Sequence, residues 1–334
     1  MNIGSIHISS SPVLALAPMA GYTDAAFRTL IAQRGADLVF SELSSASALA
    51  RSQSALARTP HSDFAQDAKT RRLMQVGEAG ITGIQLFGSN SADMAGAVGL
   101  LRQEIETGKC KARLIDLNFG CPAPKVVRNG AGSALLQDER KVQAIAEAAV
   151  KAAGPVPVTA KIRLGRTSRN NLEIARALES AGIAALTVHG RTAAQKFSGK
   201  SDWKSIGGVV EAVSVPTFGN GDVREPADVR AICDASGCAG VMVGRAVLSN
   251  PMFFTQARQY LASGKYSEAM WEDKLVFLRE YISLSPRFGL PFHAARDLAI
   301  QLATGFRGSA RLRGELMKAK DAEKLVSVME LAKA

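Results

Sequence analysis

The stretch Leu114-Ile115-Asp116-Leu117-Asn118-Phe119-Gly120-Cys121-Pro122 determines how the rest of the chain is interpreted. It begins with an apolar run typical of a buried strand and then turns sharply, because glycine and proline favour turns. The strand is expected to end at Asn118 and to present one thiol, Cys121, on a loop at its C-terminal end. A single cysteine is more often a small buried hydrophobic residue than a reactive group. Its role therefore depends on what the other strands place beside it.

Seven more apolar runs of this kind occur along the chain, and each precedes a segment with helical character. The runs are nearly continuous rather than alternating, as in parallel sheets covered on both faces. Eight strand–helix units fit an α/β fold of the closed (β/α)8 barrel type, which usually has about 250 residues. An open doubly wound sheet is the alternative, but no G-x-G-x-x-G motif follows the first strand. The eight runs are Val13–Ala17, Leu38–Phe40, Ile84–Phe87, Leu114–Leu117, Val158–Ile162, Ala185–Val188, Pro216–Phe218 and Gly240–Val243.

Polar residues and glycines stand where most of these runs end. In (β/α)8 barrels the reactive groups lie at the C-terminal ends of the strands. One polar strand end is ordinary, but a ring of them predicts a functional site at the barrel mouth. The ring consists of Pro18-Met19-Ala20, Gln85, Asn118 with Cys121, Lys161 with Arg163, His189-Gly190-Arg191, Asn220-Gly221-Asp222 and Gly244-Arg245.

The last two strand ends carry the clearest signal, which is for a phosphate group. Asn220-Gly221-Asp222 and Gly244-Arg245 are glycine-containing turns, and this pair of loops often holds a phosphate in such barrels. Arg245 can add a charge-assisted contact to the anion. Tight turns without a ligand are the alternative interpretation.

Three other strand ends favour a bound ring. Lys161 can stabilise negative charge on a ring, or else pair with a carboxylate of a neighbouring strand. Gln85 offers an amide donor and acceptor for the edge of a heterocycle. His189 is either a satisfied core histidine or, beside a phosphate site, a cofactor contact. A phosphate-bearing ring held against a thiol suggests flavin mononucleotide, FMN.

Beyond Ser263 the pattern changes to helices alone. They are expected at 267–285 with Ser267 as the N-cap, at 292–304, at 310–319, and at 322–332 with Asp321 as the N-cap. We therefore predict a barrel domain over residues 1–263 and a small helical domain over residues 264–334. The helical part is rich in basic residues, which indicates a polyanion partner more than a solvated helix face. Its arginines are Arg287, Arg296, Arg307, Arg311 and Arg313.

Composition narrows the class of protein. The formal net charge of +11 favours nucleic acid as a partner, although a generally basic enzyme is an equal alternative on charge alone. The N-terminus lacks the pattern of a signal peptide, and no apolar run is long enough to span a membrane. The four cysteines include no C-x-x-C pair and the four histidines are scattered, so no metal site is expected. A cytoplasmic monomer with free thiols is the expectation.

Six motifs, taken in chain order, resemble those of the tRNA-dihydrouridine synthase family. The resemblance covers essentially the whole chain, and the run Gly305-Phe306-Arg307-Gly308-Ser309-Ala310 favours the bacterial DusB group. The family implies an FMN-containing (β/α)8 barrel followed by a helical tRNA-binding domain. The motifs are Ala17-Pro18-Met19-Ala20-Gly21-Tyr22-Thr23-Asp24, Asn118-Phe119-Gly120-Cys121-Pro122, Lys161-Ile162-Arg163, His189-Gly190-Arg191-Thr192, Asn220-Gly221-Asp222 and Gly244-Arg245.

The resemblance also implies roles for individual residues. Hydride would pass from N5 of FMN, itself reduced by NADPH or NADH, to C6 of a specific uridine in tRNA, and Cys121 would donate a proton to C5. A thiol suits that step, because it is mostly protonated at neutral pH. Implied tRNA contacts are Asn118, Arg163, Arg191, Thr192 and the five arginines of the helical part. Implied FMN contacts are Pro18, Met19, Ala20, Gln85, Asn118, Lys161, His189, Asn220, Gly221, Asp222, Gly244 and Arg245.

Two other functions compete with this one. An FMN oxidoreductase of a small molecule would explain the barrel, but it leaves the basic helices without a role. An RNA-binding module on a degenerate barrel would not need the flavin. One departure from the family is the stretch from Ala50 to Ile81, which contains Lys69, Arg71 and Arg72 and is longer than usual.

Overall fold

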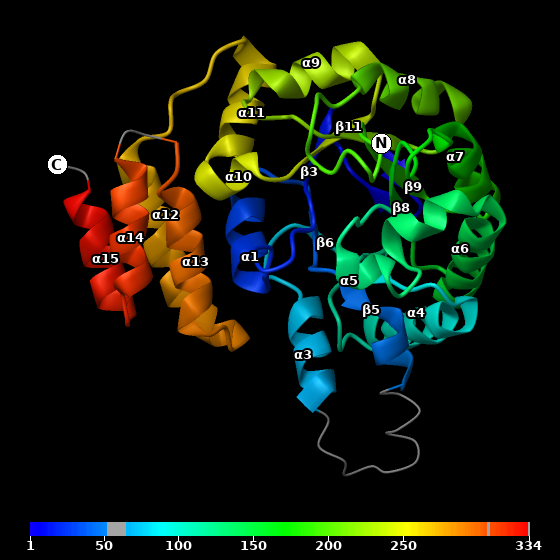
Figure 1. Cartoon of the computed structure of the whole chain (residues 1–334), viewed down its shortest axis with the longest axis horizontal. Helices are drawn as coiled ribbons and strands as arrows, with labels where there is room; N and C mark the ends of the chain where they lie inside the picture. Colours follow the sequence, from blue (N-terminus) through cyan, green and yellow to red (C-terminus); the bar gives the residue numbers. More distant parts are fainter. Residues whose placement is uncertain (52–64, 306–307, 333–334) are drawn as a thin grey trace.

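The computed structural model describes residues 1–51, 65–305 and 308–332 of the 334-residue chain. Two parts are visible in Figure 1: a ring of helices around a barrel of strands, and a group of C-terminal helices beside it. Much of the long stretch between Ala50 and Ile81 lies outside the described residues, at positions 52–64. Of that stretch, the structure shows helix 46–51 running up to it and helix α3, Ala65–Met74, after it.

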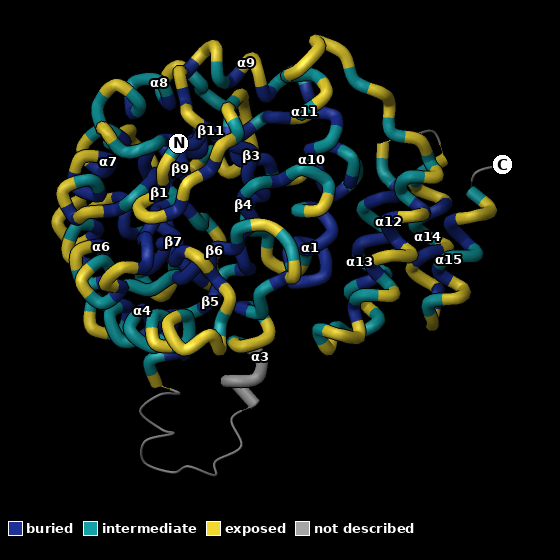
Figure 2. Tube along the Cα trace, turned by 180° about the vertical axis from the view of Figure 1, so that it is seen from behind, coloured by how far each residue is buried: buried dark blue, intermediate teal, exposed yellow. Residues whose placement is uncertain are grey.

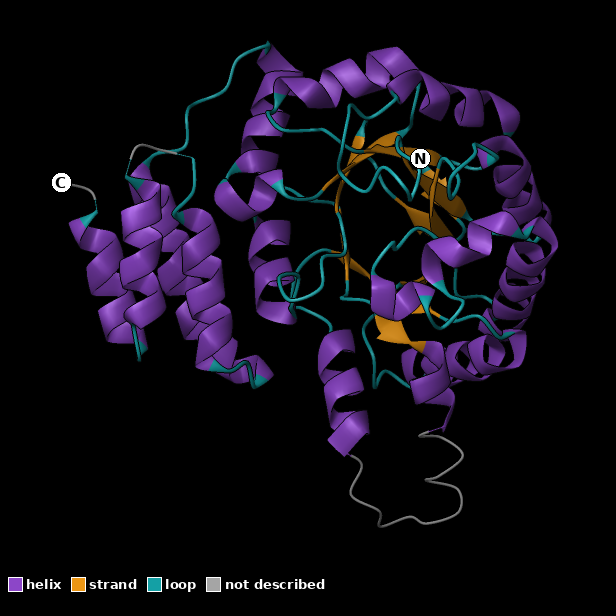
Figure 3. Ribbon diagram, viewed as in Figure 1, coloured by secondary structure: helices purple, strands orange, loops and turns teal. Residues whose placement is uncertain are grey.

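The eight predicted strands form a closed parallel barrel, with the strands inside and the helices outside (Figure 3). Pairing runs from β4 through β3, β11, β10, β9, β8 and β7 to β6, and the β4–β6 pair closes the ring. A two-residue strand, β5 (Ser44–Ser45), adds to the edge of β6. The barrel strands are β3 (Val13–Leu16), β4 (Leu38–Phe40), β6 (Ile81–Phe87), β7 (Leu114–Asn118), β8 (Val158–Arg163), β9 (Ala185–His189), β10 (Thr217–Asn220) and β11 (Gly240–Val243).

Helices surround the barrel strands, as predicted, and several of them begin at a side-chain cap. Asp24, Asn90, Asp138 and Asp202 each accept a hydrogen bond from a backbone N–H in the first turn of the following helix. The surrounding helices are α1 (Ala25–Gln33), α4 (Ser91–Glu106), α6 (Glu139–Ala153), α7 (Asn171–Ser180), α8 (Trp203–Ala212), α9 (Ala227–Ser236) and α11 (Phe253–Ser263). Short pieces that the sequence did not predict are α5 (Pro124–Val127), the 3-10 turn η1 (Gly132–Gln137) and α10 (Ala246–Ser249).

Alternate residues of each strand face two different cores, because side chains alternate across a strand. Ile115 and Leu117 belong to the larger core between strands and helices, whereas Leu114 belongs to the core inside the barrel. Asp116 and Asn118 follow the parity of Leu114 and therefore also point inward. An N-terminal hairpin, β1 (Asn2–Ile3) with β2 (Ile6–His7), adds Ile3 and Ile6 to the inner core. The buried strands appear as the dark centre of Figure 2.

The C-terminal helices pack against the barrel through α1 and α10. They are α12 (Trp271–Leu284), the 3-10 turn η2 (Ser285–Phe288), α13 (Phe292–Leu302), α14 (Ser309–Lys318) and α15 (Ala322–Leu331). Phe27 of α1 meets Phe277 of α12 edge to face, with ring centroids 5.7 Å apart. The predicted fold class, a (β/α)8 barrel followed by a helical region, is confirmed.

One predicted cap is wrong and another is confirmed. Helix α12 begins at Trp271 rather than near Ser267, and its N-cap is Met270, whose backbone N–H is bound by the Asp273 side chain. The Ser267 carbonyl instead accepts a hydrogen bond from Gln256 of α11 and keeps this segment in the linker. Asp321 caps α15 as predicted.

Candidate active site at the barrel mouth

A cavity of about 570 Å³ lies at the C-terminal ends of the strands. This volume is within the usual range for ligand pockets, about 300–1,000 Å³. The structure brings together in its lining every residue expected from the sequence to contact FMN, together with Cys121 and Arg163. Arg191 and Thr192 do not line it. The lining residues that sequence reasoning missed are Leu43, Gly120, Pro122, Phe197, Val223, Arg224, Met242, Ala246 and Ser249, with Ala17 from the first motif.

Strand register explains how residues distant in sequence reach the same level of the cavity. Asn118 of β7 lies opposite Lys161 of β8. Arg163 of β8 lies opposite His189 of β9, which in turn lies opposite Asn220 of β10. Parallel pairing thus arranges these inward-facing side chains as a polar floor around the cavity.

A chain of hydrogen bonds leads from a buried carboxylate to the Cys121 loop. The Asp116 carboxylate accepts from the Thr159 hydroxyl at 2.6 Å and from the Gln85 amide nitrogen at 2.7 Å. The Gln85 oxygen accepts from the Asn118 amide nitrogen at 2.9 Å. The Asn118 oxygen then accepts from the backbone N–H of Cys121 at 2.9 Å. Gln85 therefore uses part of its hydrogen-bonding capacity to bind Asp116 and Asn118. Asn118 holds the loop that carries the Cys121 thiol.

Two titratable groups of this floor are shifted toward neutrality. Burial raises the pKa of Asp116 to about 6, although Gln85, Thr159 and the Lys161 charge oppose the rise. Burial, aided by the Arg163 charge, lowers the pKa of Lys161 to about 8, and Asp116 limits that fall. The Lys161 ammonium donates to the Asn220 side chain at 3.0 Å. Lys161 is thus a cation of the cavity wall held between two strands, with Asp116 as its nearby countercharge.

His189 has one buried ring nitrogen without a partner among the described residues. Burial, together with the charges of Lys161 and three arginines, lowers the pKa of this residue to about 2. The imidazole is therefore neutral at physiological pH. Its Nδ1 atom is buried and makes no hydrogen bond to any described residue. Buried polar atoms usually have a partner, so this atom favours a cofactor contact over a satisfied core histidine.

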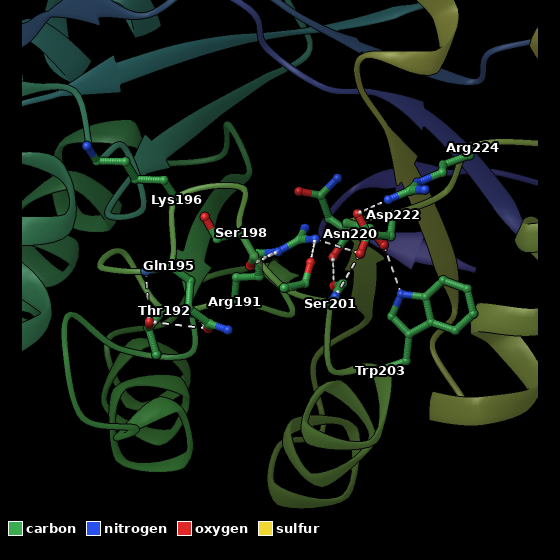
Figure 4. A network of polar contacts seen from close by, with 12 residues as sticks. Arg191, Thr192, Gln195, Lys196, Ser198, Ser201, Trp203, Asn220, Asp222 and Arg224 are labelled. Carbon is green, nitrogen blue, oxygen red and sulfur yellow. Dashed lines mark hydrogen bonds and ion pairs between the residues drawn. The ribbon is translucent and has the colours of Figure 1, made fainter.

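The end of β10 forms a rigid turn, shown in Figure 4. Gly221 has φ of 110°, a conformation that strains other residues, and a Cβ there would lie 2.5 Å from the Ser201 hydroxyl. The Gly221 carbonyl accepts from the Trp203 indole at 2.8 Å. Asp222 accepts from the Ser201 backbone N–H at 2.8 Å and forms an ion pair with Arg191 at 2.6 Å. Although burial alone would raise the pKa of Asp222, these two contacts lower it overall.

The arginines near the mouth fall into two groups. Arg163 is buried, and its guanidinium donates to the carbonyls of Gly120, Thr192 and Lys196. Arg191, only 1% exposed, donates to the Ser198 and Gly199 carbonyls and to Asp222. By contrast, Arg245 is exposed and lies 4.3 Å above the ring of Phe197, which is 56% exposed.

Arg191 and Thr192, which the family resemblance implied as tRNA contacts, lie away from the cavity lining. Both side chains are buried among the turns that follow β9 and β10, and Thr192 hydrogen-bonds with Gln195. In these positions the two side chains support the loop between Gly190 and Ser201. The sequence motif located them correctly at a strand end but gave no sign of which way they turn.

The arginines of the helical region occupy different environments. Arg287 forms an ion pair with Glu78 of the barrel part, with atoms 2.5 Å apart. Arg313 donates to Ser309 of its own helix at 3.2 Å. Arg296 is half-buried on α13 and Arg311 is exposed on α14. Arg307 lies outside the described residues.

Two absences apply to the described part of the chain. No group of three or more His, Cys, Asp or Glu side chains there is arranged to hold a metal ion. Among the same residues, no helix combines the length and the apolar character that crossing a membrane requires.

Comparison with known proteins gives consistent matches. A family model described as dihydrouridine synthase (Dus) matches residues 15–334. The tRNA-dihydrouridine synthase B of Pseudomonas putida is 38% identical over 281 residues, covering 83% of this chain and 77% of that protein. The protein of the same name from Klebsiella pneumoniae is 41% identical over 267 residues, covering 79% and 76%.

Solved structures match in fold. A mutant of morphinone reductase in complex with tetrahydroNAD has a TM-score of 0.52 and 12% identity, covering 80% of this chain and 91% of that one. Histamine dehydrogenase from Rhizobium has the same TM-score at 16% identity, covering 85% and 50%. At such identities the likeness concerns the barrel fold alone.

Proposed function

The chain belongs to the dihydrouridine synthase family, and from that premise we propose that it reduces a uridine of tRNA to 5,6-dihydrouridine, using FMN and NADPH or NADH. It is an oxidoreductase that acts on a carbon–carbon double bond. The observation that carries the finer proposal is the cavity, where Cys121, Lys161 and His189 line one space at the strand ends. Both relatives are named tRNA-dihydrouridine synthase B, which agrees with the DusB group favoured by the run Gly305–Ala310.

The residues of the cavity fit FMN on two counts. The buried, unpartnered Nδ1 of His189 needs a polar group from a ligand. The Gly221 turn and Arg245, which also line the cavity, suit an anion. We assign the ring contacts to Pro18, Met19, Ala20, Gln85, Asn118, Lys161 and His189. We assign the contacts with the phosphate end of FMN to Asn220, Gly221, Asp222, Gly244 and Arg245.

Bound FMN, reduced by the nicotinamide cofactor, would supply the hydride for C6 of the uracil. The chain's own part is to place the base and deliver a proton. Cys121 holds its proton on Sγ at the rim of the cavity, and Asn118 fixes the Cys121 backbone through its side-chain oxygen. Lys161 supplies positive charge toward the ring, where negative charge develops during reduction. The proton then passes from Cys121 Sγ to C5 of the uracil.

A uridine inside folded tRNA must leave its stack to enter this cavity, at a cost of a few kcal/mol. Contacts elsewhere on the RNA offset that cost. We propose residues 1–263 as the catalytic domain and residues 264–334 as the domain that binds tRNA. Helix α13 supports this division of roles, because its Gln301 donates to the hydroxyl of Tyr22 at 3.1 Å, in the loop that begins at the cavity residues Pro18, Met19 and Ala20. An RNA held on these helices would lie next to the mouth.

The test uses unmodified tRNA, FMN and NADPH, with dihydrouridine measured by mass spectrometry of the nucleosides. We expect product from the natural protein, and from Cys121→Ala a rate about 100–10,000-fold lower with flavin absorbance retained. Cys110→Ala is the matched control, since it removes another partly exposed thiol away from the cavity. Near-normal product from Cys121→Ala would exclude this thiol as the proton donor. Reduction of a free pyrimidine with none of tRNA would favour the small-molecule oxidoreductase instead.

A further inference from the structure

Two cysteines outside the cavity lie in contact with each other. Cys233 occupies the last turn of α9, and Cys238 follows two residues after the helix ends. Their sulfur atoms are 3.9 Å apart. Cys238 is 6% exposed and Cys233 is partly exposed, so solvent reaches one member of the pair.

The local backbone is suited to this contact. Gly237, with φ of 65°, ends the helix in a left-handed conformation that directs the chain back toward the last turn. A disulfide needs its sulfurs about 2.05 Å apart, and rotation about a side-chain bond moves a sulfur by the remaining distance. The two residues can therefore be joined with the helix end in place.

The environments of the two sulfurs are unequal. The hydrogen bond between the two sulfurs lowers the pKa of Cys238 to about 7 despite burial, and Ser236 and the backbone of Gly219 add to the effect. The same hydrogen bond, together with burial, raises the pKa of Cys233. Near neutral pH the pair shares one proton, so a thiolate is present beside a thiol that solvent can reach.

We propose that Cys233 and Cys238 form a dithiol site that hydroperoxides oxidise to an intramolecular disulfide. The Cys233 sulfur attacks the terminal oxygen of the hydroperoxide while its proton passes to Cys238. The O–O bond breaks, Cys233 becomes a sulfenic acid, and an alkoxide leaves that takes the proton from Cys238 and departs as the alcohol. The Cys238 thiolate then attacks the Cys233 sulfur, the S–S bond forms, and hydroxide leaves as the S–O bond breaks.

The balance of the reaction is complete. Two thiols lose two electrons, and one hydroperoxide is reduced to an alcohol and water once the hydroxide takes up the proton lost by the ionised pair. A small dithiol or a cellular thiol reductant reverses the reaction by thiol–disulfide exchange. Such reversible disulfides are the kind found in reducing compartments.

The test exploits the positions of the trypsin sites. Cleavage after Arg230 and Arg245 releases residues 231–245, a peptide that contains both cysteines and neither of the others. The full-length protein is treated with hydrogen peroxide, alkylated and digested. We expect this peptide to lose the mass of its two thiol hydrogens and to escape alkylation, and dithiothreitol to restore both alkylation sites.

Cys110 is the internal control, because burial raises the pKa of its thiol as well, but no other cysteine of the described residues is hydrogen-bonded to it. At the peroxide dose that converts Cys233 and Cys238 to the disulfide, Cys110 should still react with the alkylating reagent. In Cys238→Ser the remaining Cys233 should be trapped by dimedone as a sulfenic acid or proceed to the sulfinic acid, with no disulfide in the peptide. The proposal is overturned if the peptide of the natural protein stays fully alkylated at a peroxide dose that oxidises Cys110. It is also overturned if the cysteines of the peptide gain oxygen and no disulfide forms.

Discussion

A carboxylate accepts hydrogen bonds and donates none, and Asp116 stands at one end of a row of amides. Because Asp116 can only accept, Gln85 must turn its nitrogen toward it and its oxygen toward Asn118. Asn118 must then present its own oxygen to the backbone N–H groups of Gly120 and Cys121. One buried charge thus orients two side-chain amides, and through them the loop that carries the thiol.

Asp116→Asn removes this directionality, since an amide can either donate or accept at the same place. We expect the rate of dihydrouridine formation to fall by as much as about 100-fold, the scale of a small misplacement in an active site. The pH profile should change as well. In the natural protein, we expect activity to fall below about pH 6, where Asp116 takes up a proton, and above about pH 8, where Lys161 loses one.

The variant should lose the acidic limb, because the group that titrates is absent. Its alkaline limb should move to lower pH, because the Asp116 charge raises the pKa of Lys161 and the amide does not. Thr159→Val is the matched control: it removes the other hydrogen bond to Asp116 but keeps the carboxylate, and so keeps both limbs. An unchanged pH profile in Asp116→Asn would show that neither limb depends on this carboxyl.

At the scale of the elements, the barrel strands were predictable because buried parallel strands are short apolar runs between turns. The N-terminal hairpin was missed, since strands of two residues have no periodicity to detect. Asp116 and Thr159 were missed as site residues because they lie inside the runs and not at their ends. Only the inward parity of their strands places them below the cavity, where Asp116 is hydrogen-bonded to the lining residue Gln85, and this parity becomes visible once the register is known.

The contact between α1 and α12 joins the barrel to the helical region. The Tyr281 hydroxyl donates to Asp24 at 2.6 Å, and Tyr281 is 1% exposed. Burial raises the pKa of Asp24, while the bond from Tyr281 lowers it. Asp24 also caps α1 through the Phe27 N–H, so its carboxylate serves both elements.

Tyr281→Phe leaves one oxygen of that carboxylate without its donor, at an expected cost of about 1–3 kcal/mol in the free energy of unfolding. Without the donor, the folded-state pKa of Asp24 rises further above its unfolded value. The loss should therefore be full at neutral pH, where Asp24 is charged, and should shrink at acidic pH, where it is protonated in both proteins. Chemical denaturation at several pH values measures it.

Tyr260→Phe is the control for this experiment, because Tyr260 lies partly exposed on α11 and meets the ring of Tyr266 edge to face. It should be nearly neutral at every pH. A loss in Tyr281→Phe that is independent of pH would assign the effect to packing alone and not to the Asp24 charge.

For the whole molecule, the question is where a chain with a net charge of +11 places its free positive charge. The guanidinium groups of Arg163 and Arg191 bind Gly120 and Asp222 within the loops at the barrel mouth. Arg287 is paired with Glu78. Arg296 and Arg311 lie on neighbouring helices of the C-terminal region, which stands to one side of the barrel in Figure 1. These two are the best candidates for binding phosphates among the described arginines of that region.

The double variant Arg296→Gln with Arg311→Gln should bind tRNA more weakly and with a shallower salt dependence. Removing each arginine that binds a phosphate should lower the slope of log K against log salt by about 1. Because the cavity is untouched, the variant should bind the proposed FMN as the natural protein does and should reduce uridine in tRNA normally once tRNA is saturating. Filter binding at several salt concentrations and kcat against KM separate these effects.

Arg176→Gln provides the charge control, since Arg176 is exposed on α7, on the opposite side of the barrel from the C-terminal helices (Figure 1). If net charge alone attracted tRNA, this substitution would weaken binding by about as much as either single change in the helical region. If the helices hold the RNA, Arg176→Gln leaves the salt slope intact and the double variant raises KM without lowering kcat. A double variant with the natural slope would move the tRNA site away from α13 and α14 and, with it, the role proposed for residues 264–334.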